Sequence, residues 1–518
     1  SDYINANFID GYSQLRKFIA TQGPLTRTSE DFWRMVWEQE SLIIVMLANV
    51  MEGGKEKCAK YWPEVGKSCS YGGYNVETVE KKNYGSYILR SIHMEESGNE
   101  YASVLKKIQH FQYIRWPDHG VPLITSSLIR MHNKVNAEYE DLVKDKAFPI
   151  IVHCSAGAGR TGAYIGFDIL HDEMQSKNQV NVYTAVLNMR KQRMDMVQNM
   201  KQYVLLHKLL SECHALGSTA FKPNELNKRI AQHTIPSTPG PPVSWMRHNF
   251  YKVLSGKSHV LPTTLGEMPE NKKKNRYKNI LPYDSTRVVL RKSAEQSDYI
   301  NANFIDGYSQ LRKFIATQGP LTRTSEDFWR MVWEQESLII VMLANVMEGG
   351  KAKCAKYWPE VGKSCTYGGY NVETVEEKNY GFYILRSIHM EESGNEYASV
   401  LRKIQHFQYI RWPDHGVPLI TSSLIRMHNK VIADYEDLVK DKAFPIIVHC
   451  SDGAGRSGVF CTLNNLIQRL RAEDEIDVFR TVKDLRDMRP QMVRSFDNYM
   501  TCYKGLAEFR SSFDTYAN

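Results

Sequence analysis

One long stretch of this sequence occurs twice, and the duplication constrains the fold more than any other feature. The segment that begins SDYINANFIDGY starts at Ser1 and again at Ser297. An offset of this length is far beyond the roughly 20–50-residue period of solenoid repeats, so each copy must be a domain. Between 1–155 and 297–451 the copies differ only at Glu56, Ser70, Lys81, Ser86, Lys106, Asn136 and Glu138 of the first copy.

The similarity between the copies ends abruptly after His-Cys-Ser. Only 15 of the 55 positions in 156–210 match their equivalents in 452–506. Recent duplication or gene conversion of the front part would produce this pattern, and so would a misassembled gene model. The independent information therefore lies in the two diverged halves.

A proline-rich segment separates the copies. PSTPGPP at 236–242 is a cluster of residues that interrupt regular structure. The second copy also has a front piece at 242–296 that the first lacks as given, so we expect a first domain truncated at its N-terminus. The predicted division is a first domain over 1–217, a linker over 218–241 and a second domain over 242–518.

Composition excludes several classes of protein. Hydrophobic residues make up 42% and charged residues 24%, as in an ordinary globular chain, and the net charge is only +8, so we predict no nucleic-acid partner. The longest apolar run, Leu42 to Val50, is far shorter than the about 20 residues that span a bilayer. Because Ser1, Asp2 and Tyr3 are polar, we expect no signal peptide here. Nine cysteines are few and odd in number, which fits a reducing compartment.

The apolar pattern of the first copy predicts a mixed α/β fold. A buried strand, a short glycine-rich loop and a helix follow one another near the end of the copy. This order places the loop at the end of a strand, where ligands commonly bind in such sheets. The expected elements are strands over 18–21, 42–47 and 148–153 and helices over 29–37 and 159–175.

The loop in this arrangement begins with Cys154 and continues to Arg160 and Thr161. Small residues between them let backbone N–H groups turn inward and bind an anion, and the helix adds its positive end. Such a site favours a thiolate at Cys154, and Arg160 can hold two phosphate oxygens at once. Thr161 can donate a hydrogen bond to the sulfur. A buried structural cysteine before a helix is the alternative. The small residues are Ser155, Ala156, Gly157, Ala158 and Gly159.

A second motif, WPDHG at 116–120, places Asp118 between Pro and Gly. Hinges on both sides of an acid suggest a mobile loop that can deliver a proton to a leaving group. An acid in a surface turn is the alternative. His119 is better read as a residue at the rim of the site than as a metal ligand. No His, Cys or acidic cluster has ligand spacing, so we predict no metal.

Together these motifs resemble the protein-tyrosine phosphatase family, specifically the tandem cytoplasmic domains of its receptor-type members. The resemblance covers nearly the whole chain. It implies two tandem domains, each a twisted mixed sheet flanked by helices, and no cofactor. The matching stretches are NANFIDGY, QGPL, DFWRMVWE, KCAKYWP, WPDHG and VHCSAGAGRTG, with KNRY in the second copy.

The resemblance also implies a two-step phosphoryl transfer through phosphocysteine. Cys154 would attack phosphorus, Arg160 and the loop amides would hold the oxygens, and Asp118 would serve as acid and then base. Without the resemblance, the supporting residues could equally be a solvated glutamine pair and a charged turn. Those four residues are Gln198 for positioning water, Gln202 as its helper, Glu52 for bracing the arginine and Lys57 for contacting the acid loop. The resemblance also implies that Tyr277 lines the second copy's cleft.

The second copy departs from this pattern in its diverged half. It keeps Asp414, Cys450 and Arg456, but Asp452 replaces Ala156. A like charge about 6–8 Å from a dianion costs about 2–3 kcal/mol at an effective dielectric of about 20. At the two glutamine positions stand Arg494 and Asn498. We therefore expect the second domain to be weak or regulatory.

The resulting expectation is an enzyme that hydrolyses phosphotyrosine in proteins, with contacts between its two domains. As part of a single-pass receptor, it would lie on the cytoplasmic side of the plasma membrane. It would be attached to the membrane only through a segment that is absent from this chain. A phosphotyrosine-binding scaffold without efficient turnover is the main alternative. A dual-specificity phosphatase is more distant, because the deep cleft lined by Tyr277 disfavours shorter substrates.

Overall fold

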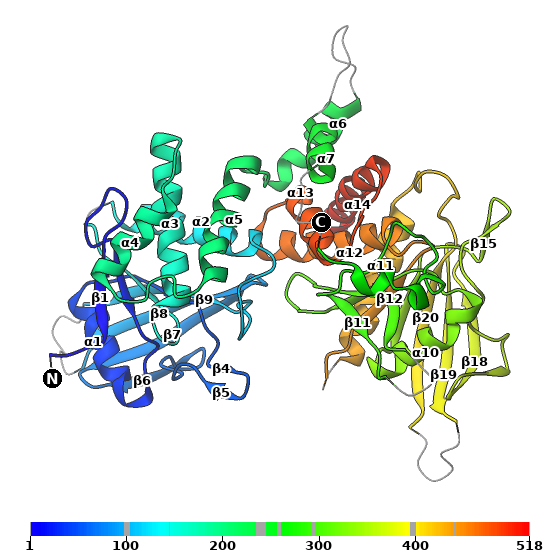
Figure 1. Ribbon diagram of the computed structural model, residues 1–518, viewed down its shortest axis with the longest axis horizontal. Helices are drawn as coiled ribbons and strands as arrows, with labels where there is room; N and C mark the ends of the chain where they lie inside the picture. The colour runs from blue at the N-terminus through cyan, green and yellow to red at the C-terminus, as the bar shows by residue number, and fades with distance from the viewer. Residues whose placement is uncertain are drawn as a thin grey trace, which may run out of the picture. The chain divides into compact units, whose positions relative to one another are not determined.

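The computed structural model describes residues 2–97, 104–144, 146–234, 245–255, 261–292, 297–393, 400–439 and 442–516. The chain divides into two compact units, unit 1 (Ser1–Ser218) and unit 2 (Thr219–Asn518). In Figure 1 unit 1 runs from blue to green and unit 2 from green to red. The predicted PSTPGPP breaker at 236–242 lies outside the described residues.

Unit 1 is built on one mixed sheet of eight strands in the order β1-β2-β10-β3-β9-β8-β7-β6. The strands β2, β10, β3 and β9 run parallel, whereas the outer pairs are antiparallel. The elements are β1 (Ala6–Ile9), β2 (Phe18–Thr21), η1 (Thr26–Thr28), α1 (Ser29–Glu38), β3 (Ile43–Met46), β4 (Met51–Glu52), β5 (Lys55–Glu56), β6 (Lys67–Tyr71), β7 (Tyr74–Asn83), β8 (Tyr87–Glu96), β9 (Lys106–Tyr113), α2 (Ser126–Leu142), β10 (Ile150–His153), α3 (Gly159–Lys177), α4 (Val182–Gln192) and α5 (Met200–Leu216).

Apolar side chains on both faces of the central strands hold helices against the sheet. In β3, Ile43 and Val45 belong to the core shared with α2, α3, α4 and α5, whereas Ile44 and Met46 belong to the core shared with α1. This alternation follows from the two-residue period of a strand, and burial on both faces explains why β3 is continuously apolar. The expected strands and helices of the first copy are all present.

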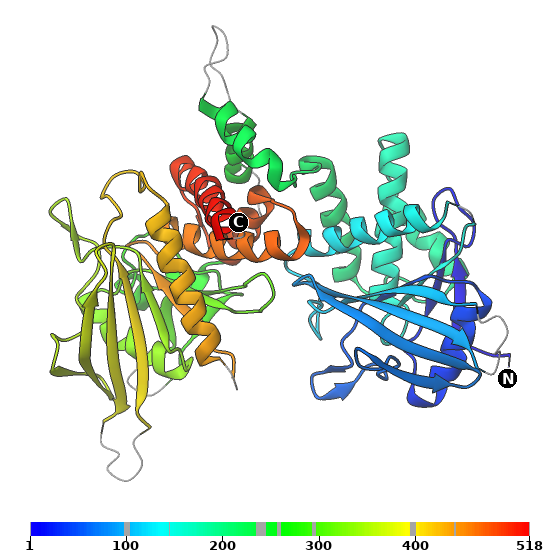
Figure 2. The same cartoon turned by 180° about the vertical axis from the view of Figure 1, so that it is seen from behind.

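Unit 2 repeats this architecture with a ninth strand, in the order β11-β12-β13-β21-β14-β20-β19-β18-β17. Figure 2 shows helices and strands of both units from behind. The expected fold class, a mixed sheet flanked by helices in each domain, is therefore confirmed. Its elements are η2 (Pro223–Glu225), α6 (Leu226–Thr234), α7 (Trp245–Ser255), α8 (Thr264–Glu267), α9 (Pro269–Lys272), β11 (Arg287–Val289), β12 (Tyr299–Ile305), β13 (Phe314–Thr317), η3 (Thr322–Thr324), α10 (Ser325–Glu334), β14 (Ile339–Met342), β15 (Met347–Glu348), β16 (Lys351–Ala352), β17 (Lys363–Tyr367), β18 (Tyr370–Asn379), β19 (Tyr383–Glu392), β20 (Arg402–Tyr409), α11 (Ser422–Leu438), β21 (Ile446–His449), α12 (Gly455–Glu473), α13 (Val478–Met488) and α14 (Phe496–Tyr516).

Part of the segment assigned to a linker, 218–241, packs onto unit 2. Phe221 forms a β-bridge with Ile476, and its ring stacks on Tyr503. Thr219 donates a hydrogen bond to the Asp477 carboxylate at 2.9 Å. An aromatic anchor and a buried hydrogen bond thus attach this segment to unit 2. None of the described helices has the length and apolar composition needed to cross a bilayer.

Candidate active sites

The phosphate-loop candidate of unit 1 follows β10 and leads into α3. Cys154 is 4% exposed, and its sulfur accepts a hydrogen bond from the Gly157 N–H at 3.3 Å. Gly157 has a φ of +70°, and a Cβ there would collide with the carbonyl of Thr21. Glycine is therefore required at this turn, which brings a backbone donor to the sulfur.

Arg193 holds the loop from outside. Its Nε donates to the Gly157 carbonyl at 2.7 Å and its Nη2 to the Ala156 carbonyl at 3.3 Å, while Nη1 donates to Asn7. With these carbonyls fixed outward, the N–H groups of the loop remain available to an anion. The sequence analysis did not identify Arg193. The sequence does hold a clue to its importance, because the diverged second copy retains an arginine at the equivalent position, Arg489.

Arg160 and Glu52 form a fork-to-fork pair. Nη1 and Nη2 of Arg160 each donate to one carboxylate oxygen of Glu52 at 2.8 Å. Nη2 also donates to the carbonyl of Pro117 at 3.1 Å, so the same guanidinium contacts the acid loop. The bidentate contact fixes the plane of the guanidinium, which is the condition for two-point binding of a phosphate.

Asp118 lies beside Lys57, with its Oδ1 2.9 Å from Nζ. The hydrogen bond from the ammonium lowers the pKa of the Asp118 carboxyl below its ordinary value, so it is ionised at neutral pH. Its other oxygen lies against Gly53, whose φ is +55° and where a Cβ would collide with it. The sequence analysis missed Gly53, which leaves room for the acid in this position.

Gln198 and Gln202 both approach the start of α3. A Cβ built on Gly159 would lie 2.7 Å from Nε2 of Gln202 and 3.3 Å from Oε1 of Gln198. Gln202 accepts the N–H of Gln198 at 2.8 Å. The preceding Val197 has a φ of +57°, a conformation that a β-branched residue rarely adopts. Arg190 donates to its carbonyl at 2.8 Å and so stabilises the strained turn that presents Gln198.

The expected hydrogen bond from Thr161 to the sulfur is not formed. Its Oγ1 is buried and has no partner among the described residues. In unit 2 the equivalent Ser457 donates to Cys450 at 3.3 Å. The β-branched threonine has fewer χ1 choices in a helix than serine, which accounts for the difference.

Behind the loop, a buried aromatic network supports the strand that carries Cys154. Tyr61 Oη lies 2.7 Å from His153 Nε2 and 2.8 Å from His110 Nε2. Burial lowers the pKa of His153 to about 4, so this histidine is neutral. The described residues contain no group of three or more His, Cys, Asp or Glu side chains arranged to hold a metal ion.

Comparison with known proteins agrees with this geometry. The model of the family described as protein-tyrosine phosphatase matches residues 1–212 and 271–508. The chain belongs to the protein-tyrosine phosphatase family. Both units carry the family's match, as the two copies predicted.

The relatives that match along the whole chain are receptor-type phosphatases, which confirms the expected resemblance. The chain is 41% identical to receptor-type tyrosine-protein phosphatase F of Danio rerio and covers 26% of it. It is 41% identical to receptor-type tyrosine-protein phosphatase S of Gallus gallus, covering 33%. It is 39% identical to receptor-type tyrosine-protein phosphatase alpha of Mus musculus, covering 61%. The chain thus spans less than two thirds of each of these relatives.

The second phosphatase unit has the same clamp. Arg456 donates to Glu348 at 2.8 and 2.9 Å and to the Pro413 carbonyl at 3.0 Å. Lys353 Nζ lies 2.7 Å from Asp414, and its hydrogen bond lowers the pKa of that carboxyl. The lysine–aspartate and arginine–glutamate geometry is therefore the same in both units.

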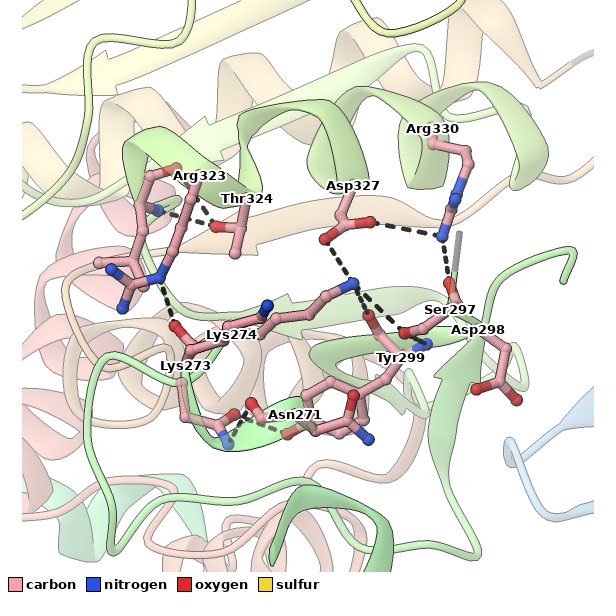
Figure 3. Close-up of polar contacts among 12 residues, drawn as sticks. Asn271, Lys273, Lys274, Ser297, Asp298, Tyr299, Arg323, Thr324, Asp327 and Arg330 are labelled. Atoms are coloured by element: carbon pink, nitrogen blue, oxygen red, sulfur yellow. Dashed lines mark hydrogen bonds and ion pairs between the residues drawn. The ribbon is translucent and has the colours of Figure 1, made fainter. Parts of the chain in front are cut away.

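The front piece of unit 2 brings Tyr277 to its phosphate loop. Tyr277 Oη lies 2.9 Å from Ser451 Oγ. Figure 3 shows the preceding residues bound to η3 and α10: Lys274 reaches Asp327 of α10 at 2.9 Å, and Arg323 of η3 donates to the Lys273 carbonyl. The basic run that contains Tyr277 is therefore part of the unit's structure.

Proposed function

We propose that unit 1 hydrolyses phosphotyrosine in proteins by transferring the phosphoryl group first to Cys154 and then to water. One observation carries this proposal. Arg160 donates to Glu52 and to the carbonyl of Pro117, so the anion clamp and the acid loop are held together beside Cys154. A clamp for phosphoryl oxygens, a nucleophile and an acid within one site are the parts that phosphomonoester hydrolysis needs.

In the first step, the Cys154 thiolate forms a bond to phosphorus as the bond from phosphorus to the tyrosine oxygen breaks. Asp118 donates its proton to that oxygen, and Arg160 and the loop amides hold the phosphoryl oxygens. Lys57 favours the ionised acid in the ligand-free site. The charge of a bound dianion raises the pKa of Asp118 and so supplies the protonated form.

In the second step, water attacks phosphorus and the bond from sulfur to phosphorus breaks. Asp118, now ionised, takes the proton from this water. Gln198 orients the water, and Gln202 holds the Gln198 backbone at 2.8 Å. Inorganic phosphate leaves, and Cys154 returns to the thiolate.

We assign unit 2 a weak catalytic and mainly regulatory role. Its loop contains Cys450 and Arg456, but Arg494 stands where Gln198 orients water. The names of the receptor-type relatives support a place at the cytoplasmic face of the plasma membrane.

The test is turnover of a phosphotyrosine peptide by the full chain and by Cys154→Ser and Cys450→Ser. We expect Cys154→Ser to abolish turnover and Cys450→Ser to leave kcat/KM within about twofold. Loss of activity only in Cys450→Ser would overturn the assignment of the units. A wild-type chain that binds the peptide without turnover would instead support a binding module.

A further inference from the structure

We propose that Asp452 determines what the loop of unit 2 can bind: its carboxylate occupies the loop's own amides and so excludes phosphoryl groups. The proposal deepens, and rests on, the proposed function of these loops as phosphate sites. It treats Asp452 as a resident anion rather than only as a charge near the site.

The contacts of one carboxylate oxygen carry the argument. Oδ1 of Asp452 accepts the N–H of Ala454 at 2.9 Å and the N–H of Gly455 at 3.0 Å. It also accepts the thiol of Cys450 at 3.1 Å. Three donors that face the centre of a phosphate loop therefore converge on one oxygen that belongs to the chain itself.

The second oxygen is held as well. Oδ2 of Asp452 lies 3.5 Å from Nη1 of Arg494, the residue that replaces the water-positioning glutamine. A Cβ built on Gly455 would lie 3.7 Å from this oxygen and 3.1 Å from Asn498. The three residues that distinguish the second site thus meet at one point. Arg494, which is 49% exposed, offsets part of the charge of the resident carboxylate, so the two substitutions act as a pair.

The state of the cysteine follows from this contact. Burial, and after it the charge of Asp452, raise the pKa of Cys450 to about 11. A thiol that donates to a carboxylate is protonated and is a poor nucleophile. In unit 1, Ala156 has no side-chain oxygen, and Cys154 instead accepts the Gly157 N–H.

A phosphoryl group could enter the second loop only by displacing this carboxylate from its amides. The carboxylate is 16% exposed and has Arg494 as its partner, so it stays close to the loop when displaced and repels the incoming dianion. Occupancy and charge therefore both oppose phosphate.

The experiment measures alkylation of Cys450 and Cys154 in the same full-length chain by iodoacetate, resolved by peptide mass spectrometry. We expect Asp452→Ala to raise the Cys450 rate about threefold for each unit by which the Cys450 pKa falls. The thiolate fraction rises tenfold for each unit by which the pKa of the thiol falls. A thiolate of lower pKa is a weaker nucleophile, and this offsets about half of the gain on a logarithmic scale. The Cys154 rate is the internal control and should stay constant.

Protection by inorganic phosphate then separates occupancy from reactivity. Phosphate should slow Cys450 alkylation in Asp452→Ala but not in the wild type. Asp452→Asn keeps an oxygen for the two amides without the charge, so phosphate should protect this variant much less than the alanine variant. Equal protection in both would overturn occupancy, and an unchanged Cys450 rate in Asp452→Ala would overturn the proposal altogether.

The reverse change gives an independent arm. Ala156→Asp combined with Gln198→Arg should slow alkylation of Cys154 and remove its protection by phosphate, while Cys450 is unaffected. Turnover of phosphotyrosine peptide by the wild type is measured beside it. If the wild type shows no turnover, the proposed function fails, whereas the alkylation rates still decide the role of Asp452.

Discussion

The two phosphate loops have the same backbone but different contents. Gly157 and Gly453 have φ angles of +70° and +67°, and each loop arginine meets its glutamate at 2.8 Å. Yet one cysteine accepts a backbone N–H and the other donates to Asp452. The scaffold of the site is therefore set by the backbone and the arginine–glutamate pair, and side chains of the diverged half decide what the scaffold holds.

The same contrast appears at a buried charge far from the phosphate loop. In unit 1, Lys17 and His132 contact the Asp168 carboxylate at 2.7 and 3.0 Å. Lys313 and His428 of unit 2 are identical to Lys17 and His132, but the position of Asp168 holds Asn464. Identical front halves thus meet different partners on α3 and α12.

The largest expected effect comes from giving unit 1 the asparagine of unit 2. Asp168→Asn would take the closer carboxylate from the buried Lys17 and leave only Asp172, whose Oδ2 lies 3.3 Å from Nζ. Breaking a buried pair costs at most about 3–5 kcal/mol of unfolding free energy. The loss of unfolding free energy in unit 1 is measured by urea unfolding, followed by hydrogen exchange of peptides from α2 and α3.

The matched control is Asn464→Asp in unit 2, which supplies a carboxylate near Lys313. It should not destabilise unit 2 by more than about 1 kcal/mol. A loss below about 1 kcal/mol in Asp168→Asn would mean that the pair does not account for the difference between the units.

Gly53 offers a test of which unit is the catalyst. In Gly53→Ala the new Cβ collides with the Asp118 carboxylate, so proton donation to a poor leaving group should fall about 100-fold in kcat. p-Nitrophenyl phosphate, whose leaving group needs little protonation, should lose much less. Comparing the two substrates separates a displaced acid from a damaged fold.

The chain supplies two controls for this variant. Gly54→Ala has a similar cost of positive φ, at +75°, but its Cβ meets nothing within 4 Å, so activity should remain. Gly349→Ala makes the equivalent collision with Asp414 in unit 2 and should leave turnover unchanged. Equal losses from Gly53→Ala and Gly54→Ala would show that backbone strain, not the acid, is responsible.

Much of the site could be predicted because its chemistry is local in sequence. Cys154 and Arg160 lie on one loop, and the apolar run before it marks a central strand. The pairing of Arg160 with Glu52 connects residues 108 positions apart, and only the resemblance suggested it. Composition and periodicity alone do not specify which distant side chains meet.

The contacts that sequence reasoning missed depend on the direction in which a side chain points. Asp452 was expected to repel a phosphate, but its turn back onto the amides of its own loop is a property of local backbone geometry. Arg193 binds the loop from another element, and the collision at Gly53 depends on the position of Asp118. The type of each residue indicated which chemistry it could perform, whereas the fold determined which group it contacts.

The missing carboxylate in unit 2 also predicts a pH dependence. Burial lowers the pKa of Lys313 from 10.5 to about 8. Between these values the unfolded chain binds more protons than the folded one, so unit 2 gains stability as pH rises. From about pH 7.5 to 9.5 the gain is about 2 kcal/mol at 1.36 kcal/mol per unit.

The measurement is the pH dependence of the free energy of unfolding of unit 2, compared between the parent and Lys313→Met. It uses urea unfolding with hydrogen exchange of β13 peptides. The subtraction removes other titrating groups. Lys17→Met is the matched variant in unit 1. There the pKa of Lys17 is raised by its acid partners, so both states are protonated in this window and no slope is expected. Parallel slopes in parent and Lys313→Met would contradict the assignment.

The smallest expected effect tests whether Asn498 alone weakens unit 2. In unit 1, Gln202→Asn shortens the side chain that accepts the Gln198 N–H at 2.8 Å. Loss of one such hydrogen bond is worth about 1 kcal/mol, or about fivefold in the rate of the second step. Rapid-quench kinetics with a phosphotyrosine peptide should show a larger burst of the phosphorylated enzyme, because Gln198 presents water less often while Asp118 and Arg160 are unchanged. A slower first step with no larger burst would place Gln202 in substrate binding, and Arg494 would then be the residue that separates the two units in water attack.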